Sequence, residues 1–410
     1  MEFEITKEIF NVNLDMIATL ALATLLLLLG NYLRKKISFL DKFCIPGPVI
    51  GGLLFAIIIF ISKTVNLFNL EMDTTLQSPF MIAFFTTIGL GASFSLIKKG
   101  GKLLIIYWIL CGGLAIFQNI IGVIVAKLTN INPLIGIMCG AVSMEGGHAN
   151  AASFGATIEG LGVNGAVTIG MAAATFGVIF GGIIGGPVSR YLIDKYNLKP
   201  SVEEYDKNIS VEETAGIKLS DSFNSSTMIT QIAVIASCMT IGNLFGSWFS
   251  NATGVVLPGY VGAMFVAVLF RNLNDKINIV KIDLYSVDII SNVCLGIFLT
   301  MALMSIKLWE LAGLAGPMIV IVLAQVIFIA LYGIFIGFRL LGKDFDAAVM
   351  VSGMLGHGLG ATPNALANIN SVTSKYGNST KAFLIVPLVG AFLVDLVGIP
   401  TIVTFINFFS

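Results

Sequence analysis

Residues 143–150 read Ser-Met-Glu-Gly-Gly-His-Ala-Asn and lie inside the otherwise apolar segment 133–155. Residues 357–364 read His-Gly-Leu-Gly-Ala-Thr-Pro-Asn and lie inside a second apolar segment, 345–372. A continuous helix that faces lipid does not tolerate glycine and polar groups at its centre, because irregular backbone at membrane depth needs partners from protein or water. We therefore predict that both segments are re-entrant hairpins.

The remaining chain has the composition of a polytopic membrane protein. Of its 410 residues, 56% are hydrophobic and 11% are charged, whereas a soluble domain carries roughly 25% charged residues. The mean hydropathy is +0.94. Most apolar segments approach the roughly 20 residues that a membrane-spanning helix needs. With the two hairpins included, these segments are about 14–33, 46–62, 79–97, 103–126, 133–155, 165–190, 228–249, 255–270, 286–305, 315–338, 345–372 and 382–408. We expect an all-α polytopic fold with ten spans and two hairpins.

The basic residues give this arrangement an orientation, because cytoplasmic loops carry an excess of lysine and arginine. If the N-terminus is outside and each hairpin returns to its starting side, the outer loops hold only Lys7, Lys63, Lys127 and Lys307. All other lysines and arginines then lie inside. We therefore expect a multi-pass protein of the cell inner membrane with both termini outside and the polar stretch 193–227 as a cytoplasmic linker.

Matching motifs indicate that the chain has two related halves. Ile-Pro-Gly-Pro-Val at 45–49 aligns with Leu-Pro-Gly-Tyr-Val at 257–261, and the same shift along the chain takes Gly146 of the first hairpin to Gly358 of the second. Each half has five spans, and an odd number inverts the second half relative to the first. We predict inverted repeats at 1–192 and 228–410, whose hairpins enter from opposite faces.

The same stretches resemble the bacterial sodium/glutamate symporter family. Residues 143–152 are similar to its Gly-Gly-His-Gly-Thr-Ala region, residues 358–368 resemble its second signature, and residues 387–395 look like its last span. The resemblance covers nearly the whole chain. It implies a sodium-coupled glutamate carrier with two re-entrant loops that forms a homodimer. By analogy with related inverted-repeat carriers, it suggests an elevator-type secondary transporter, whose transport domain moves against a dimerising scaffold.

The candidate substrate-binding residues lie at the tips of the two hairpins. Glycine lets a chain turn sharply and exposes backbone N–H and C=O groups. Threonine followed by proline is typical of a helix start, and the positive end of a helix dipole attracts anions. Close helix packing is the alternative role for the glycines. The predicted substrate-binding residues are Gly146, Gly147, His148, Asn150, Gly358, Gly360, Thr362, Pro363 and Asn364.

The candidate ion-binding residues carry the oxygen ligands that hard cations prefer. Acidic groups inside membrane segments are costly and point to function. The predicted set is Ser143, Glu145, Asn368 and Asp395. We expect no arginine or lysine at mid-membrane, so bound Na⁺ has to balance the charge of an anionic substrate.

We expect no cofactor and no metal site beyond Na⁺. His148 and His357 are the only histidines, and each has an alternative role as a hydrogen-bonding residue of the fold. The five cysteines show no metal-binding spacing, and we interpret them as small packing residues.

The leading function is therefore sodium-coupled symport of glutamate by alternating access. A carrier of another organic anion, such as a dicarboxylate or hydroxy acid, is the first alternative, because Ala149 and Asn150 stand where the family usually has Gly-Thr. An ion channel is the second, and a membrane enzyme is disfavoured because no nucleophile–base arrangement emerges. The expected partners are glutamate or a related small anion, Na⁺, the lipid bilayer and a second copy of the chain. A net charge of zero gives no sign of nucleic-acid binding.

Overall fold

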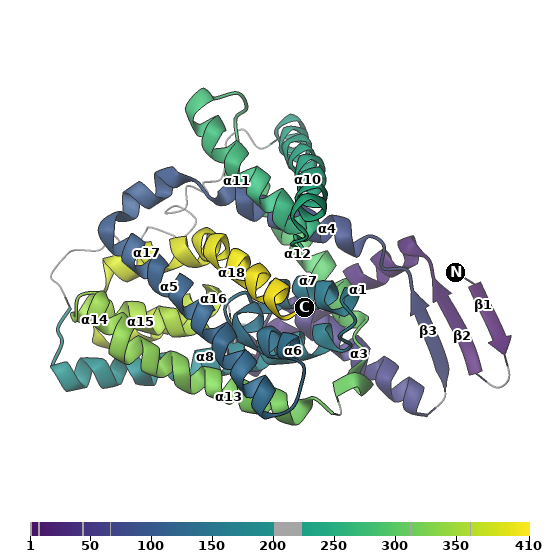
Figure 1. Cartoon of the computed structure of the whole chain (residues 1–410), viewed down its shortest axis with the longest axis horizontal. Helices are drawn as coiled ribbons and strands as arrows, with labels where there is room; N and C mark the ends of the chain where they lie inside the picture. Colours follow the sequence, from purple (N-terminus) through teal and green to yellow (C-terminus); the bar gives the residue numbers. More distant parts are fainter. Residues whose placement is uncertain are drawn as a thin grey trace.

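The computed structural model describes residues 2–6, 9–42, 45–65, 67–200, 224–311, 313–360 and 362–410 and is mainly helical (Figure 1). The first half contains β1 (Glu2–Thr6), β2 (Ile9–Leu14), α1 (Met16–Lys36), α2 (Ser38–Lys42), α3 (Gly47–Thr64), β3 (Phe68–Met72), α4 (Gln77–Gly91), α5 (Phe94–Leu128), α6 (Pro133–Ile137), a π-helix (Met138–Val142), α7 (Gly147–Gly160) and α8 (Ala166–Tyr196). The second half contains α10 (Ser225–Thr253), α11 (Gly259–Ile277), α12 (Leu284–Met304), a 3-10 helix (Leu308–Leu311), α13 (Ala315–Tyr332), a π-helix (Gly333–Gly337), α14 (Phe338–Leu340), α15 (Phe345–His357), α16 (Thr362–Tyr376), α17 (Thr380–Leu388), a π-helix (Val389–Leu393) and α18 (Val394–Phe409).

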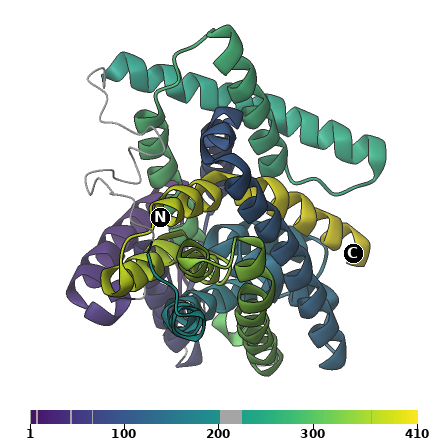
Figure 2. The same cartoon turned by 90° about the vertical axis from the view of Figure 1, so that its left-hand side faces the viewer.

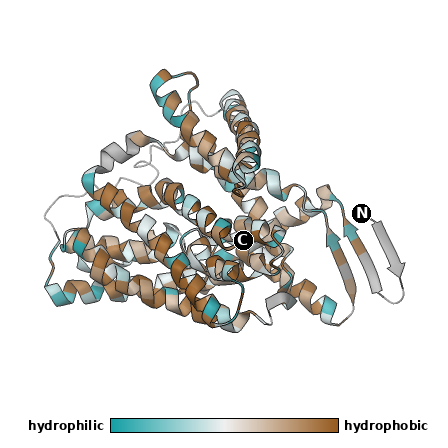
Figure 3. Cartoon of the chain, in the orientation of Figure 1, coloured by the Kyte–Doolittle hydropathy of each residue, from teal (hydrophilic) through white to brown (hydrophobic). Residues whose placement is uncertain are grey.

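Seven helices in the described part of the chain are long and apolar enough to cross a membrane, and α17 with α18 makes an eighth if that bent pair is one span. The seven are α1, α3, α5 from Gly101 onward, α8, α10, α12 and α13 continued through α14. Apolar residues run along these helices (Figure 3), and many large apolar side chains, such as Ile109 and Trp248, are exposed. Such a surface suits lipid rather than water, which agrees with the predicted polytopic membrane protein.

Two of the ten predicted spans are helices that do not meet this standard of length and composition. The helix α4 has only 15 residues. The helix α11 ends in a charged turn that carries Arg271, Asp275 and Lys276. The two helices pack against each other, and α4 also packs against α12 while α11 packs against α10, so these contacts bury part of both helices.

A small sheet departs from the all-helical prediction. Strand β1 pairs antiparallel with β2, and β2 pairs in parallel with β3. The three strands lie at one end of the molecule, beside the N-terminus (Figure 1). The sequence of β2, Ile-Phe-Asn-Val-Asn-Leu, partly alternates apolar and polar residues, which is the pattern of a strand. The prediction missed the sheet because a search for apolar segments overlooks short strands outside the spans.

The first two membrane helices of each half make the same contact. Asn31 of α1 lies against Gly47 at the start of α3, and Asn243 of α10 lies against Gly259 at the start of α11. A Cβ atom added to either glycine would lie 1.9 Å from the asparagine Oδ1. Both glycines follow a proline that caps the helix. Small residues allow helices to approach this closely, and the two contacts are related by the same shift along the chain as the Pro-Gly motifs.

Both predicted hairpin segments contain an interrupted helix at the glycine-rich motif. In the first, α6 and its π-helix lead to a break at Glu145 and Gly146, and α7 then continues to Gly160 rather than ending near residue 155. In the second, α15 ends at His357, and α16 runs to Tyr376 rather than to residue 372. That each segment returns to its starting side of the membrane stays a prediction.

The last predicted span, 382–408, is broken instead of continuous. The helix axis turns by 42° between α17 and α18, and a π-helix lies at the turn. Pro387 lies just before this turn, and proline removes a backbone donor and clashes with the preceding turn of a helix. The indole Nε1 of Trp108 donates to the carbonyl of Leu393 at 2.6 Å. The bend therefore has both a cause in the sequence and a partner in the fold.

Helix α5 supplies hydrogen bonds to all three broken segments. Besides Trp108, its Gln118 donates from Nε2 to the carbonyl of Gly358 at 2.7 Å, and the Oδ1 of Asn119 accepts from the N–H of Ala141 at 3.0 Å. Broken helices free backbone groups that have no water to bind inside a membrane. Helix α5 thus provides a hydrogen-bond partner for a backbone group in each of the three interrupted segments.

The predicted linker 193–227 is shorter at both ends. Helix α8 continues to Tyr196, and α10 begins at Ser225. Residues 201–223 of this linker lie outside the described residues.

Candidate transport site

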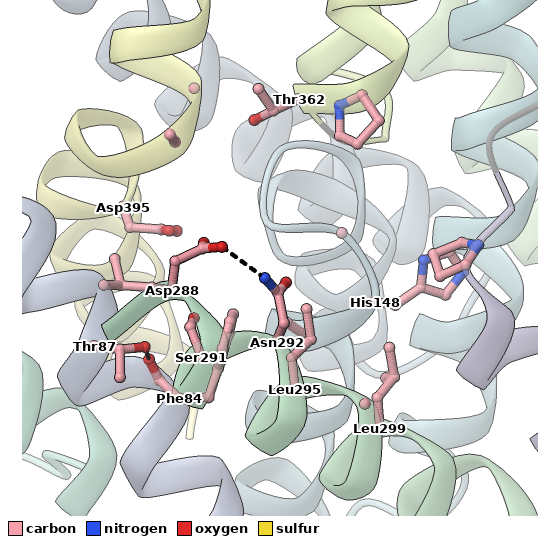
Figure 4. A pocket seen from close by; sticks show the side chains of 18 of the residues that line it. Phe84, Thr87, His148, Asp288, Ser291, Asn292, Leu295, Leu299, Thr362 and Asp395 are labelled. Atoms are coloured by element: carbon pink, nitrogen blue, oxygen red, sulfur yellow. Dashed lines mark hydrogen bonds between the residues drawn. The ribbon is translucent and has the colours of Figure 1, made fainter. Parts of the chain in front are cut away.

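The three broken segments meet at a cavity of about 730 Å³. The N-terminal ends of α7 and α16 and the bend before α18 form one side, and α1, α3, α4 and α12 form the other. In Figure 4, Thr362, Asp395 and His148 surround the cavity, and Asp288 and Asn292 of α12 face it from another side. Its polar and glycine lining includes Asn31, Arg34, Gly47, Thr87, Glu145, Gly146, Gly147, His148, Asp288, Ser291, Asn292, His357, Gly360, Thr362, Gly390 and Asp395.

The tips of the two hairpin segments touch each other. Gly147 has a φ of +62°, and a Cβ atom there would lie 2.6 Å from the carbonyl oxygen of Gly360. A glycine is therefore required at this position both by the backbone conformation and by the contact. The contact holds the starts of α7 and α16 together at the cavity. Helix starts carry unpaired N–H groups and partial positive charge, so this wall is suited to an anion.

Two carboxylates lie beside these helix starts. Asp395 accepts a hydrogen bond from Nδ2 of Asn150 at 3.2 Å, which links α18 to α7. Glu145 is only 8% exposed, and neither of its carboxylate oxygens has a hydrogen-bond partner among the described residues. A buried carboxylate without a partner is costly unless a cation or a proton neutralises it. The site therefore suits a cation next to the anion-binding wall.

Both histidines are buried and hydrogen-bonded within the fold. His148 places Nε2 3.1 Å from the hydroxyl of Thr175, which itself donates to a main-chain carbonyl, so His148 is the donor. His357 places Nε2 2.8 Å from the hydroxyl of Tyr107. Both rings also line the cavity. They are available to a ligand, but each already has a role in positioning its segment.

Three predicted site residues hold the broken segments against α8 rather than lining the cavity. Ser143 donates from its hydroxyl to the carbonyl of Gly170 at 2.8 Å. The amide nitrogens of Asn364 and Asn368 donate to further carbonyls of α8, at 2.6 and 2.9 Å. Gly358, another predicted site residue, is bound by Gln118 of α5. Direct ligand binding by these four residues stays a prediction, and their observed contacts are structural.

The cavity wall also contains residues that are not in the predicted site. Arg34 lies on the wall, with Nε 3.3 Å from an oxygen of Asp41 and a side chain that is 36% exposed. Asp288 accepts from Nδ2 of Asn292 at 2.9 Å. The spacing of these residues along the sequence could have identified them. Asn31 and Arg34 are three residues apart, and the α12 residues that line the cavity recur every three to four residues, so each set shares one face of its helix.

Cys111, Glu145 and His357 form a buried cluster, and Glu145 and His357 of this cluster also line the cavity. One ligand atom of each lies within 4.8 Å of the others, and the Sγ of Cys111 is 3.6 Å from Nε2 of His357. All five cysteines were expected to be packing residues because none has metal-ligand spacing along the chain, whereas this cluster combines residues that are far apart in the sequence. Cys44 lies outside the described residues.

A second cavity, of about 690 Å³, lies toward the opposite ends of α4 and α12. Its wall includes Asn243 and Gly259. Their counterparts in the first half, Asn31 and Gly47, line the first cavity. Matching residues of the two halves therefore line two different cavities.

Comparison with known proteins gives these observations a family. Residues 12–378 match the family model described as sodium/glutamate symporter. The chain is 42% identical to the sodium/glutamate symporter of Escherichia coli (strain K12) over 389 residues, which covers 94% of this chain and 96% of that protein. It is also 42% identical to the sodium/glutamate symporter of Haemophilus influenzae over 383 residues, 93% of this chain and 94% of that protein.

Among solved structures, the sodium proton antiporter MjNhaP1 from Methanocaldococcus jannaschii matches with a TM-score of 0.46 and 15% identity, covering 96% of this chain and 98% of that chain. The family model and the relatives cover almost the whole sequence, including both hairpin motifs. The chain belongs to the sodium/glutamate symporter family, whose members are transporters and not enzymes.

Proposed function

We propose that this protein couples the movement of Na⁺ to the movement of glutamate across the membrane by alternating access. Its relatives are named for this pair of substrates. The observation that carries the proposal is the meeting of two helix N-termini with buried carboxylates in one cavity. The helix N-termini can bind an anion, and the carboxylates can bind a cation in the same cavity.

In this proposal the glutamate carboxylates bind at the starts of α7 and α16. Discontinuous helices of secondary carriers commonly aim their N-terminal ends at anionic groups. The free N–H groups near Gly147 and Thr362 supply donors, and Arg34 supplies a positive charge at the wall. The substrate-binding set of the sequence analysis thus divides into wall residues, which contact the ligand, and Asn150, Asn364 and Gly358, which support the wall.

Sodium binds next to Glu145 and Asp395. Three carboxylates (Glu145, Asp288 and Asp395) and one guanidinium (Arg34) line the cavity. An anion that enters alone meets an excess of negative charge, and each bound Na⁺ reduces that excess by one. Coulomb energy between two unit charges 4 Å apart is about 4 kcal/mol at the effective dielectric of a protein surface. Na⁺ and glutamate therefore assist each other's binding.

Alternating access follows if the two halves are inverted repeats. The repeated Asn–Gly contacts and the two cavities with matching wall residues support this arrangement. The first cavity lies near the Arg34 end of α1, which the charge rule assigns to the cytoplasm, so the described state is the inward-facing one. The second cavity marks where the outward path opens.

An elevator-type movement divides the molecule into two parts. The three broken segments with α5 and α8 form the moving part, because hydrogen bonds hold them together. Helices α10 and α11 lie side by side at one edge of the molecule (Figures 1 and 2) and belong to the static part. A homodimer formed through the static part and an inner-membrane location with both termini outside complete the proposal.

The test is uptake of labelled L-glutamate into proteoliposomes that contain the purified protein. An inward Na⁺ gradient is expected to drive accumulation, and an equal K⁺ gradient is not. Unlabelled dicarboxylates and hydroxy acids are added as competitors. Sodium-driven uptake of another acid in place of glutamate would reassign the substrate. An ion flux that does not saturate as the ion concentration rises would indicate a channel. No sodium-driven uptake of any of these acids would refute the proposal.

A further inference from the structure

We propose that Cys111, Glu145 and His357 form a binding site for a borderline or soft divalent cation of the Zn²⁺ type. The three residues come from α5, from the break before α7 and from the end of α15. They are far apart in the sequence, so only the packing of the broken segments against α5 brings them together.

The chemistry of the three ligands fits such a cation. Zn²⁺ takes cysteine sulfur, histidine nitrogen and carboxylate oxygen, and open zinc sites have three protein ligands. Na⁺ prefers oxygen alone and gains little from sulfur or imidazole. This corner of the cavity therefore favours a transition-metal ion over the coupling ion.

The geometry of two of the ligands fits as well. With bonds of about 2.3 Å to sulfur and about 2.0 Å to nitrogen, a tetrahedral zinc ion sets its sulfur and nitrogen ligands about 3.5 Å apart. Cys111 Sγ and His357 Nε2 are 3.6 Å apart. Their positions need almost no adjustment to share one ion. Binding would replace the hydrogen bond between His357 and Tyr107.

The third ligand is the second, independent sign of a site. Glu145 is more than nine-tenths buried, since its exposed fraction is 8%, and both of its oxygens lack hydrogen-bond partners among the described residues. The Nδ1 of His357 also lacks one within that part of the chain and carries the imidazole proton when Nε2 binds the metal. A divalent ion would neutralise the carboxylate. Glu145 and His357 line the cavity, which provides an entry path and an open fourth position.

Co²⁺ is the probe that reads the site directly, because sulfur ligation gives a charge-transfer absorption band in the near ultraviolet. The purified full-length protein in detergent is titrated with Co²⁺, and Zn²⁺ is then added to displace it. We expect one Co²⁺ per chain with a sulfur band that Zn²⁺ removes. No gradient or glutamate is used, so the outcome is independent of the transported substrate.

Three variants assign the band to a residue. Cys111→Ser should abolish the sulfur band and weaken Zn²⁺ binding by roughly 100-fold or more, since loss of even an outer-shell partner costs roughly 10- to 100-fold. Cys139→Ser is the matched control, because Cys139 is also a buried free cysteine but lies outside the cluster. Its binding should equal that of the wild type. Glu145→Gln should keep the band and weaken binding.

A fourth variant covers the case in which Cys111→Ser does not fold. It retains Cys111 and replaces the other four cysteines with serine, and its sulfur band should persist. Absence of a band in the wild-type protein at saturating Co²⁺, or a band that survives Cys111→Ser, would overturn the proposal. A further consequence rests on the proposed function: Zn²⁺ should inhibit sodium-driven uptake by occupying Glu145, and Cys111→Ser should reduce that inhibition.

Discussion

Replacing Gly147 with alanine is expected to weaken glutamate uptake strongly without unfolding the protein. The new Cβ atom would lie 2.6 Å from the carbonyl oxygen of Gly360, whereas real Cβ atoms keep at least 3.0 Å. The hairpin tips therefore have to move apart to admit the methyl group. The φ of +62° adds about 1–2 kcal/mol for a residue with a Cβ atom. A total near 2 kcal/mol corresponds to about a 30-fold loss of affinity.

The assay is the Michaelis constant for sodium-driven glutamate uptake in proteoliposomes, with thermal unfolding as a check on the fold. Two glycines near the end of α7 provide matched controls. A Cβ atom on Gly160 or Gly162 meets nothing within 4 Å, and only Gly162 has a positive φ, of +91°. Gly160→Ala tests the substitution alone, and Gly162→Ala adds the backbone strain. If Gly147→Ala kept an uptake affinity within twofold of both controls, the contact between the tips would have no role in binding.

The remaining predictions test the cation, the supporting helix and the anion wall. Asp395→Asn should raise the sodium concentration at half-maximal uptake by at least about tenfold, since bonds to a charged group contribute about 1.5–3 kcal/mol; unchanged sodium dependence would remove Asp395 from the site. Gln118→Leu should lower the free energy of unfolding by about 1–3 kcal/mol because the buried carbonyl of Gly358 loses its donor, as measured by thermal unfolding, and an unshifted transition would contradict this role. Arg34→Gln should raise the Michaelis constant for glutamate about fivefold, the size of a half-exposed charge interaction, while Lys35→Gln, at an exposed position beside it, should not; equal effects of the two would refute a specific role for Arg34.

The sequence was informative where a single residue type has one physical consequence. Glycine and polar groups within an apolar segment predicted interrupted helices, and the breaks lie at Gly146 and after His357. The bend before α18 was missed because proline and glycine, here Pro387 and Gly390, also occur in continuous membrane helices. In such helices, neighbouring segments can provide hydrogen-bond partners for the freed backbone groups. What distinguishes this case is Trp108, which lies 285 residues away from the carbonyl that it binds.

The candidate site was predicted in part. The hairpin tips were expected at the site, and the structure places Gly147, His148, Gly360 and Thr362 on one cavity wall. Arg34 was used only to orient the chain, although it lies on the opposite wall. Sequence position cannot show that a helix end folds toward a cavity, because side-chain direction depends on the neighbouring helices.

By itself, the sequence determined a polytopic membrane protein, because hydropathy and glycine act locally. It also determined the family, because the resemblance to that family extends over nearly the whole chain. Only the tertiary structure decided which groups meet. It paired Gly147 with Gly360, placed Cys111 beside His357 and directed Asn364 and Asn368 to the carbonyls of α8. The reason is physical: inside a membrane a broken helix must find hydrogen-bond partners on other segments, and the identity of those partners follows from packing between residues far apart in the chain.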